Sequence, residues 1–269
     1  MIRARLLGLA AVLALLAVGL GVGPASAAGT ATVSVLHAVP GVTVDVYANG
    51  QKLLSNFTPG TLTDPMSVPA GSYDIAIFPA GSNPSNTQPA AEAKGVSVPA
   101  GANATLVANL DAQSKPALNA FVNDGSAVPA GKARVTVRHV AAAPAVDVRA
   151  NGTPVLTGLT NPAEKTLVVA AGTVKADVVL AGTSTVAIGP ADLSLAEGTT
   201  TAVYAWGSQS AGYKLAVQKL SGMSSAPSGV PAGSGGLVDD GLPAPVLGLS
   251  LAGLLIAGAA GLRLAGRRG

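Results

Sequence analysis

Between residues 29 and 220 the chain is a series of short alternating or valine-rich runs, separated by proline, glycine, asparagine and aspartate. Runs of this kind, bounded so often by turn residues, are typical of short β-strands. No run of helical period and useful length occurs ahead of the C-terminal tail. In the first half we expect strands near residues 32–37, 42–48, 61–68, 72–78, 95–98, 105–110 and 117–122. In the second half we expect strands near residues 133–139, 145–150, 164–169, 173–181, 192–195, 199–206 and 213–219.

One motif occurs twice: HAVPGVTVDVYANG in the first half and HVAAAPAVDVRANG in the second. An Asn-Gly pair between strands favours a type I′ hairpin turn, because both central positions of that turn need a positive φ. The repeat predicts two tandem all-β domains, which we expect to be β-sandwiches with an immunoglobulin-like look. The motif residues are His37, Asp45, Asn49 and Gly50 in the first copy and His139, Asp147, Asn151 and Gly152 in the second.

The N-terminal 28 residues have the layout of a secretory signal peptide. Arg3 and Arg5 precede an unbroken apolar run, and the small residues Ala-Ser-Ala follow it at 25–27. We expect cleavage near residue 28. The alternative is a retained N-terminal membrane anchor, because the apolar run is long for a signal peptide.

The C-terminal segment predicts one membrane-spanning helix. Arg263 is the one charged residue among the largely apolar residues 244–264, and a helix of this length reaches across the hydrocarbon core of a bilayer. Asp239 and Asp240 precede the segment and basic residues follow it. The positive-inside rule therefore places the C-terminus in the cytoplasm and the body of the protein outside the cell.

The tail also resembles the signals by which sortases attach surface proteins to the cell wall. The corresponding residues 242–246 read Leu-Pro-Ala-Pro-Val, with Pro and Val where an LPxTG-type motif has Thr and Gly. Because the Thr-Gly bond is the one that the transpeptidase cleaves, a plain single-span anchor is favoured over covalent attachment.

These patterns predict a division of the chain into seven parts. In order they are a signal peptide (1–28), a first β-sandwich repeat (29–123), a linker (124–132), a second β-sandwich repeat (133–220), a Gly/Ser/Pro stalk (221–243), a transmembrane helix (244–264) and a cytoplasmic basic tail (265–269).

Composition argues against nucleic-acid binding and excludes any chemistry of cysteine. Five of the 16 basic residues lie in the terminal segments, which leaves eleven between them against 13 acidic residues. The outward part is therefore slightly acidic, and nucleic-acid binding loses its electrostatic basis. The sequence contains no cysteine, which excludes disulfides and thiolate metal sites.

A resemblance to the bacterial cell-envelope family known as domain of unknown function 4397 rests on three segments: VLHAVPGVTVDVYANGQKLLSN, VPAGSYDIAIFPAGS and NDGSAVPAGKARVTVRHVAAAPAVDVRANGTPVL. Members typically carry a strand ending in His-Ala, a Pro-containing loop, Val-Asp-Val-Tyr and an Asn/Asp-Gly turn. The resemblance covers about residues 31–220 as two copies and implies a secreted or surface-anchored β domain without an established activity. The second copy has Val140 for the alanine and Arg149 for the tyrosine, which suggests that neither position is a required chemical group.

His37 and His139 are the candidates for a metal site or a general base. Each stands at the end of a predicted strand, in phase with the valines before it. One interpretation is structural: the imidazole caps the following loop or bonds to Asp45, or to Asp147 in the second copy. The other interpretation is a site built on the His-Asp pair, although one histidine and one aspartate per repeat fall short of the three protein ligands of catalytic zinc.

Aromatic side chains give a binding hypothesis. Aligning Gly101 with Gly198 places Tyr204 and Trp206 opposite Val107 and Asn109 of the first copy. An asparagine at the equivalent position suggests that Trp206 faces solvent, where with Tyr204 and Tyr213 it would form a flat platform for a glycan or polymer. The alternative is that Trp206 belongs to the core.

We therefore expect a membrane-anchored extracellular protein of a bacterial cell envelope, with a binding, adhesion or structural role. We expect no catalytic activity, no cofactor, no bound metal and no nucleic-acid partner. Expected partners are the membrane, through the C-terminal helix, and cell-wall polymer or a surface protein. The competing interpretation is an envelope enzyme or metal-binding module that uses the His-Asp pair of each repeat.

Overall fold

The computed structural model describes residues 29–220, which form sixteen β-strands. The predicted signal peptide, stalk, transmembrane helix and basic tail lie outside the described residues. Within 29–220 there is no helix that is long and apolar enough to cross a membrane.

The strands fall into two repeats of eight. The first repeat contains β1 (Thr30–Ala38), β2 (Val44–Ala48), β3 (Gln51–Phe57), β4 (Met66–Pro69), β5 (Gly71–Pro79), β6 (Ala91–Val98), β7 (Asn103–Leu110) and β8 (Pro116–Val122). The second repeat contains β9 (Lys132–Ala142), β10 (Val146–Ala150), β11 (Thr153–Leu159), β12 (Glu164–Ala170), β13 (Gly172–Leu180), β14 (Val186–Leu195), β15 (Thr200–Ser208) and β16 (Gly212–Leu220).

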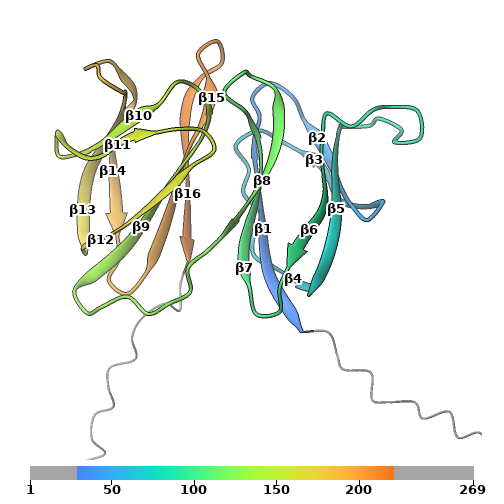
Figure 1. The fold of residues 1–269 in the computed structure, drawn as a ribbon, viewed down its shortest axis with the longest axis horizontal. Coiled ribbons are helices and arrows are strands. Elements are labelled where there is room, and N and C mark those ends of the chain that lie inside the picture. The colour runs from blue at the N-terminus through green and yellow to red at the C-terminus, as the bar shows by residue number, and fades with distance from the viewer. Residues whose placement is uncertain (1–28, 221–269) are drawn as a thin grey trace, which may run out of the picture. The chain divides into compact units, whose positions relative to one another are not determined.

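Both repeats have the same topology, in two four-stranded sheets each (Figure 1). The orders are β4-β1-β7-β8 and β3-β2-β5-β6 in the first repeat, and β12-β9-β15-β16 and β11-β10-β13-β14 in the second. The pairs β1/β7 and β9/β15 are parallel, and all other pairs are antiparallel. The all-β sandwich expected from the sequence is confirmed.

Each sandwich has an apolar core between its two sheets. In the first repeat Val35 and Leu106 from one sheet face Val46 and Ile77 from the other. The second repeat has an equivalent cluster on the equivalent strands, including Val137. Alternation along the strands therefore directs every second side chain inward, as the period of a β-strand requires.

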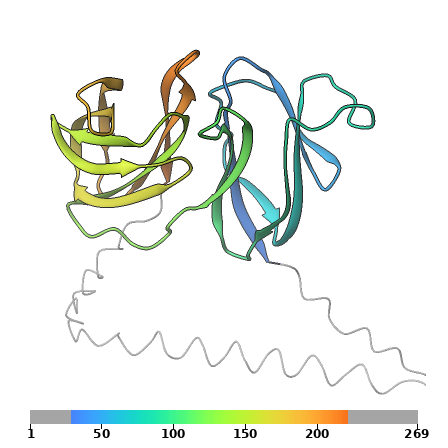
Figure 2. The same ribbon diagram turned by 45° about the horizontal axis from the view of Figure 1, so that its top comes forward.

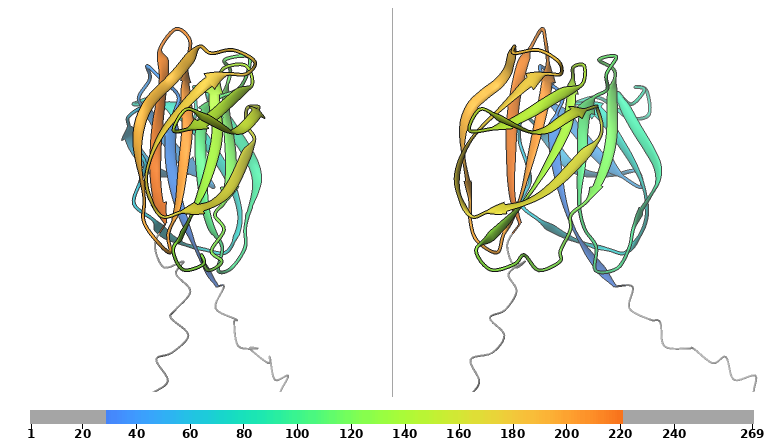
Figure 3. Two further views of the ribbon diagram at one scale, coloured as in Figure 1. Left: turned by 90° about the vertical axis from the view of Figure 1, so that its left-hand side faces the viewer. Right: turned by 60° about the vertical axis from the view of Figure 1, so that its left-hand side comes forward.

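A third apolar cluster joins the two repeats. It contains residues on the outer face of the sheet β4-β1-β7-β8 and on the outer face of the sheet β12-β9-β15-β16, which we call the central sheets. Its members are Leu36, Ala38, Val107, Phe121, Val140, Ala202, Tyr204 and Trp206. The central sheets are therefore covered on both faces, and nearly every residue of β9 and β15 is buried. Figure 2 and the right-hand view of Figure 3 show the two repeats side by side from other directions, with the central sheets where the repeats meet.

The repeated Asn-Gly pairs form the predicted hairpin turns. Asn49 and Gly50 have φ values of 49° and 75°, and Asn151 and Gly152 have values of 49° and 81°. Positive φ at both central positions is the requirement of a type I′ turn. The turns connect β2 to β3 and β10 to β11.

Strands β3 and β11 differ from the expectation, which placed no strand directly after either Asn-Gly turn. Both strands are largely exposed, with the burial pattern of an edge strand. Each is interrupted by a register shift, and each has a residue of positive φ, Asn56 in β3 and Gly158 in β11. Since a bulge disturbs the alternation of side chains, the period of two that signals a strand is lost in both segments.

Candidate functional site

The two histidines fasten the loop that follows their strand. His37 Nε2 lies 2.8 Å from the carbonyl oxygen of Val42, and His139 Nε2 lies 3.0 Å from that of Pro144. A carbonyl oxygen only accepts, so Nε2 carries the proton in both rings. The other ring nitrogen, Nδ1, accepts a long 3.4 Å hydrogen bond from the backbone N–H two residues on, that of Val39 or Ala141.

Both imidazoles are fully buried and neutral. Their relative exposure is 0%. Burial lowers the pKa of His37 and His139 below the ordinary value for histidine, and the hydrogen bond to the loop carbonyl opposes this only in part. With both nitrogens engaged by backbone, each ring acts as a clip between its strand and its loop.

The two aspartates bind backbone groups at a different part of each sandwich from the histidines. Asp45 accepts hydrogen bonds from the backbone N–H of Asn56, at 2.9 Å, and from that of Gly81, at 3.3 Å. It also forms a 2.7 Å ion pair with Lys52, and this contact is the main reason why the pKa of Asp45 lies below its usual value. The carboxylate thus holds the bulge of β3 and the turn after β5.

Asp147 repeats the two backbone contacts of Asp45. It accepts hydrogen bonds from the N–H of Gly158, at 2.8 Å, and of Gly182, at 3.4 Å. The histidine and the aspartate of each repeat therefore have separate partners, and the described residues show no hydrogen bond between them. Residues 29–220 also contain no group of three His, Cys, Asp or Glu side chains close enough to share a metal ion.

Asn49 and Asn151 have a second role beyond the turn. The side-chain oxygen of Asn49 accepts from the N–H of Asp74 at 2.8 Å, and that of Asn151 accepts from the N–H of Lys175 at 3.1 Å. These contacts tie each hairpin turn to the neighbouring strand, β5 or β13. All eight residues of the repeated motif thus support turns and loops of the sandwich.

The aromatic platform is wrong for Tyr204 and Trp206. The alignment behind it is correct, since β15 and β7 pair with β9 and β1 in the same register. However, Asn109, the residue equivalent to Trp206, is itself fully buried, and its side-chain oxygen accepts a hydrogen bond from Asn119 at 2.7 Å. Tyr204 is 0% and Trp206 4% exposed. The asparagine at the equivalent position therefore marked a face that lies between the two repeats, and the prediction that this face is exposed to solvent is wrong.

Trp206 packs against a glycine of the other repeat. Gly60 has a φ of 82°, and a Cβ atom added to it would lie 3.1 Å from the indole ring. Lys214 Nζ lies 5.3 Å from the centroid of the same ring. Of the three predicted platform residues only Tyr213 is partly exposed, and its hydroxyl makes one long contact, 3.5 Å, with the carbonyl of Ala142.

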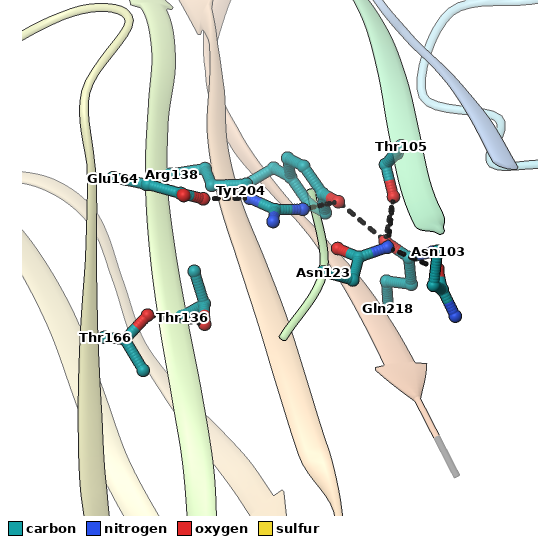
Figure 4. A network of polar contacts seen from close by, with 9 residues as sticks. All are labelled: Asn103, Thr105, Asn123, Thr136, Arg138, Glu164, Thr166, Tyr204 and Gln218. Atoms are coloured by element: carbon teal, nitrogen blue, oxygen red, sulfur yellow. Dashed lines mark hydrogen bonds and ion pairs between the residues drawn. The ribbon is translucent and has the colours of Figure 1, made fainter. Parts of the chain in front are cut away.

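A buried polar network links the two central sheets (Figure 4). Arg138 on β9 forms a 2.8 Å ion pair with Glu164 and donates to the Tyr204 hydroxyl at 2.6 Å. The Tyr204 hydroxyl donates to Gln218 Oε1 at 2.6 Å, and Thr105 of the first repeat donates to the same oxygen at 2.9 Å. The chain of contacts therefore runs from β12 across β9, β15 and β16 to β7.

The Arg138 guanidinium also lies against two aromatic rings. Its central carbon is 4.7 Å from the centroid of Phe121, on the first repeat, and 5.2 Å from that of Tyr204. Burial raises the pKa of Tyr204, so its hydroxyl keeps its proton and can donate. Glu164 and Tyr204 of its own repeat satisfy the buried guanidinium, whereas the Phe121 ring and the Thr105–Gln218 hydrogen bond connect the network to the first repeat.

Two further contacts reinforce the junction. Asn161 donates through Nδ2 to the carbonyl of Leu110 in the first repeat, at 2.8 Å, and to that of Ala141 in the second, at 2.6 Å. Arg134 forms a 3.3 Å ion pair with Asp124 and donates to the carbonyl of Ser126 at 2.9 Å, which fixes the segment between the repeats.

Arg138 was not among the residues predicted from the sequence to form a site. A signal was present, because Arg138 stands where the first copy has Leu36, in a strand otherwise rich in valine. A leucine in one copy and an arginine at the equivalent position of the other indicate that this face of the strand has a different environment in each repeat.

Each sandwich also contains an apolar cavity between its two sheets. The cavity of the first repeat measures about 110 Å³ and that of the second about 100 Å³. Val33 and Met66 line the first cavity, and Val135 and Leu167 line the second. The cavities lie at equivalent places, since Val33 pairs with Met66 across β1/β4 as Val135 pairs with Leu167 across β9/β12.

Comparison with known proteins gives one family. The sequence model of the family described as Domain of unknown function (DUF4397) matches residues 31–149, which run from β1 through nearly all of β10. No curated protein matches the chain. The match supports the resemblance to this family over residues 31–149.

Proposed function

We propose that this chain is a membrane-anchored protein of a bacterial cell surface, and that residues 29–220 form a rigid, non-catalytic binding or structural unit outside the cell. In this proposal residues 1–28 are a cleaved signal peptide, and residues 244–264 are a membrane-spanning helix without covalent attachment to the wall. Both repeats are copies of the family's domain, with the immunoglobulin-like look expected from the sequence. Cell-wall polymer and surface proteins are the partner classes.

One observation carries the non-catalytic part of the proposal. The side chains most able to do chemistry are already engaged within the fold: both imidazoles hold loop carbonyls, and the Tyr204 hydroxyl and Arg138 lie buried between the repeats. A general base must reach a substrate proton, and a ring that is 0% exposed with both nitrogens bonded to backbone lacks that reach. Because the junction between the repeats is buried, we expect the two repeats to move as one rigid unit, which suits a binding or structural role.

The topology is tested by cysteine labelling, for which the cysteine-free sequence is suited. Ala112→Cys lies in the exposed turn between β7 and β8, and Gly269→Cys is at the C-terminus. Intact cells that produce either variant are treated with a membrane-impermeant maleimide. We expect labelling of Ala112→Cys in intact cells and of Gly269→Cys only after lysis. Labelling of the C-terminal cysteine in intact cells contradicts the proposed orientation.

The role is tested by cosedimentation of the 29–220 fragment with purified cell envelopes. We expect binding that His139→Gln leaves unchanged at a temperature where this variant is folded. Loss of binding in folded His139→Gln would instead favour a site that uses the histidine.

A further inference from the structure

The two apolar cavities are the feature that no role in the fold explains. Their walls come from equivalent strands of the two repeats: Val33, Val35 and Ala48 in the first correspond to Val135, Val137 and Ala150 in the second. Because a cavity of similar volume lies at the same place in both copies, we regard it as a property of the repeat.

The side chains that line the cavities differ between the copies, yet the volumes agree. Tyr73 and Ile75 of the first cavity correspond to the smaller Val174 and Ala176 of the second. The volumes nevertheless remain about 110 and 100 Å³. A packing defect in one copy would not be expected to persist at constant size through such changes, because close packing is the usual state of a protein core.

The walls offer almost no polar chemistry. The polar lining residues of the first cavity are Ser97 and Tyr73, whose hydroxyl donates to the Pro69 carbonyl at 2.7 Å. Those of the second are Arg149 and Asp177, which form a two-bonded ion pair with each other at 2.6 and 2.8 Å. The backbone groups of the lining strands are paired within their sheets except along the outer sides of the edge strands, where they lie in the plane of the sheet and do not face the space between the sheets. A peptide segment placed there would leave its own backbone groups without partners, whereas a hydrocarbon needs none.

The size of the cavities restricts the ligand further. A dry cavity of about 150 Å³ holds one benzene molecule, so about 100 Å³ holds roughly four carbon atoms. Several wall residues, among them Val68, Val96 and Leu193, are only partly buried, so the cavities open to solvent. A ligand therefore places a slender apolar end inside and the remainder outside.

We propose that each sandwich binds the end of one unbranched alkyl chain of an amphiphile, so that one protein molecule binds two. This inference rests on the proposed function, because a protein anchored in the cell membrane stands beside a constant supply of acyl chains. An alkyl chain is thus the ligand class that we propose for residues 29–220, whose other buried surfaces form the cores and the junction.

The test is calorimetric titration of the 29–220 fragment with decanoate below its micelle-forming concentration. The fragment contains all sixteen strands, the cores and the junction, and its folding is checked by circular dichroism. We expect two bound molecules per chain and a negative heat-capacity change, the marker of apolar burial.

Cavity-filling variants localise the binding. Ala104→Leu adds three carbon atoms to the first cavity and Ala176→Leu adds three to the second. Each is expected to reduce the stoichiometry from two to one, and the pair to abolish binding. Ala170→Leu and Ala196→Leu, at exposed positions outside both cavities, are the matched controls and are expected to bind two. Each single variant keeps one unchanged cavity, which reports that the protein is still folded.

The inference is overturned if the wild-type fragment binds no decanoate or if the double variant still binds two molecules. A second arm with phosphatidylglycerol vesicles identifies the source of the chain: sedimentation with vesicles that the double variant loses indicates bilayer lipid, and binding of decanoate alone indicates a free amphiphile. Failure of decanoate binding leaves the cysteine-labelling result untouched, so the ligand and the cell-surface role fail separately.

Discussion

At the scale of single residues, the repeated histidine shows how one side chain can supply the hydrogen bonds that a loop backbone would otherwise receive from a neighbouring strand. The loop after β1 and the loop after β9 leave the sheet, and their carbonyls need donors. An imidazole at the end of the strand supplies one donor through Nε2 and one acceptor through Nδ1. The motif recurs because each repeat has the same loop to hold.

Replacing His139 by alanine is expected to lower the melting temperature of the 29–220 fragment. The change leaves the Pro144 carbonyl without its donor and opens a cavity, which together cost about 1–3 kcal/mol. For a unit of this size, that corresponds to a fall of roughly 2–12 °C. Gln209→Ala in the exposed turn between β15 and β16 is the control and is expected to melt as the wild type does. An unchanged midpoint in His139→Ala, with a wild-type midpoint that added divalent metal raises, would show that the residue is a metal site.

The depressed histidine pKa values predict how stability depends on pH. In the unfolded chain both histidines titrate near about pH 6.5, whereas burial keeps them neutral to lower pH in the folded protein. Their contribution is therefore complete above about pH 6.5 and is lost as the pH falls, because only the unfolded state takes up protons there. The slope is at most about 1.4 kcal/mol per pH unit for each histidine.

Urea unfolding at pH 7.5 and pH 5.5 measures this effect. The double variant His37→Gln/His139→Gln is expected to lose most of the difference. Asp45, whose pKa is lowered by Lys52, contributes only nearer pH 4, so it does not enter this window. Equal stability of the wild type at the two pH values would mean that the rings are protonated inside the fold.

At the scale of elements, the central strands show where sequence patterning misleads. Arg134, Thr136 and Arg138 alternate with valines along β9, which is the pattern of a strand with one wet face. All three are buried, because their face meets the other repeat, and their polar groups bond to Ser126 in the segment between the repeats and to Thr166 and Tyr204 on neighbouring strands. Alternation identifies the two faces of a strand correctly, but it does not distinguish water from a polar protein surface.

Other elements were predictable for an identifiable reason. Strands such as β7 and β13 were expected within two residues of their observed ends, since Gly and Pro mark their turns. In contrast, β3 and β11 carry a bulge and few buried residues, so only their position after a hairpin turn indicated them. The loop-capping role of His37 was among the interpretations of the sequence, whereas the contacts of Tyr204 depended on the meeting of two repeats.

The polar network of the central sheets predicts a large effect for one hydroxyl. Tyr204→Phe removes the acceptor of Arg138 and one donor to Gln218, in a place where water does not reach. We expect a loss of about 1–3 kcal/mol in the free energy of unfolding. Tyr213→Phe, which removes only a 3.5 Å contact at a partly exposed site, is the matched control and is expected to cost under about 0.5 kcal/mol. Equal losses in denaturant unfolding would show that the network does not stabilise the junction.

At the scale of the whole described unit, the two repeats share one apolar cluster and one polar network, so neither has a complete surface alone. The outer face of the first repeat carries apolar side chains, among them Leu36, Val107 and Phe121, together with Thr105 of the polar network. The facing side of the second repeat supplies Tyr204 and Trp206. The two contacting faces are therefore complementary to each other and differ in sequence, although they lie on equivalent strands of the two repeats.

The last prediction follows from this division. The fragment 29–123 on its own exposes the face that contains Leu36 and Phe121, and an exposed contiguous apolar patch promotes association. We expect sedimentation velocity to show self-association of 29–123 and a monomer for 29–220. Phe121→Lys in the short fragment places a charge in the centre of that face and is expected to restore the monomer, whereas Val122→Lys, at the neighbouring residue that is 67% exposed, is expected to leave the association unchanged. A monomeric 29–123 with the same melting temperature as 29–220 would mean that each repeat is stable by itself and that the junction only orients them.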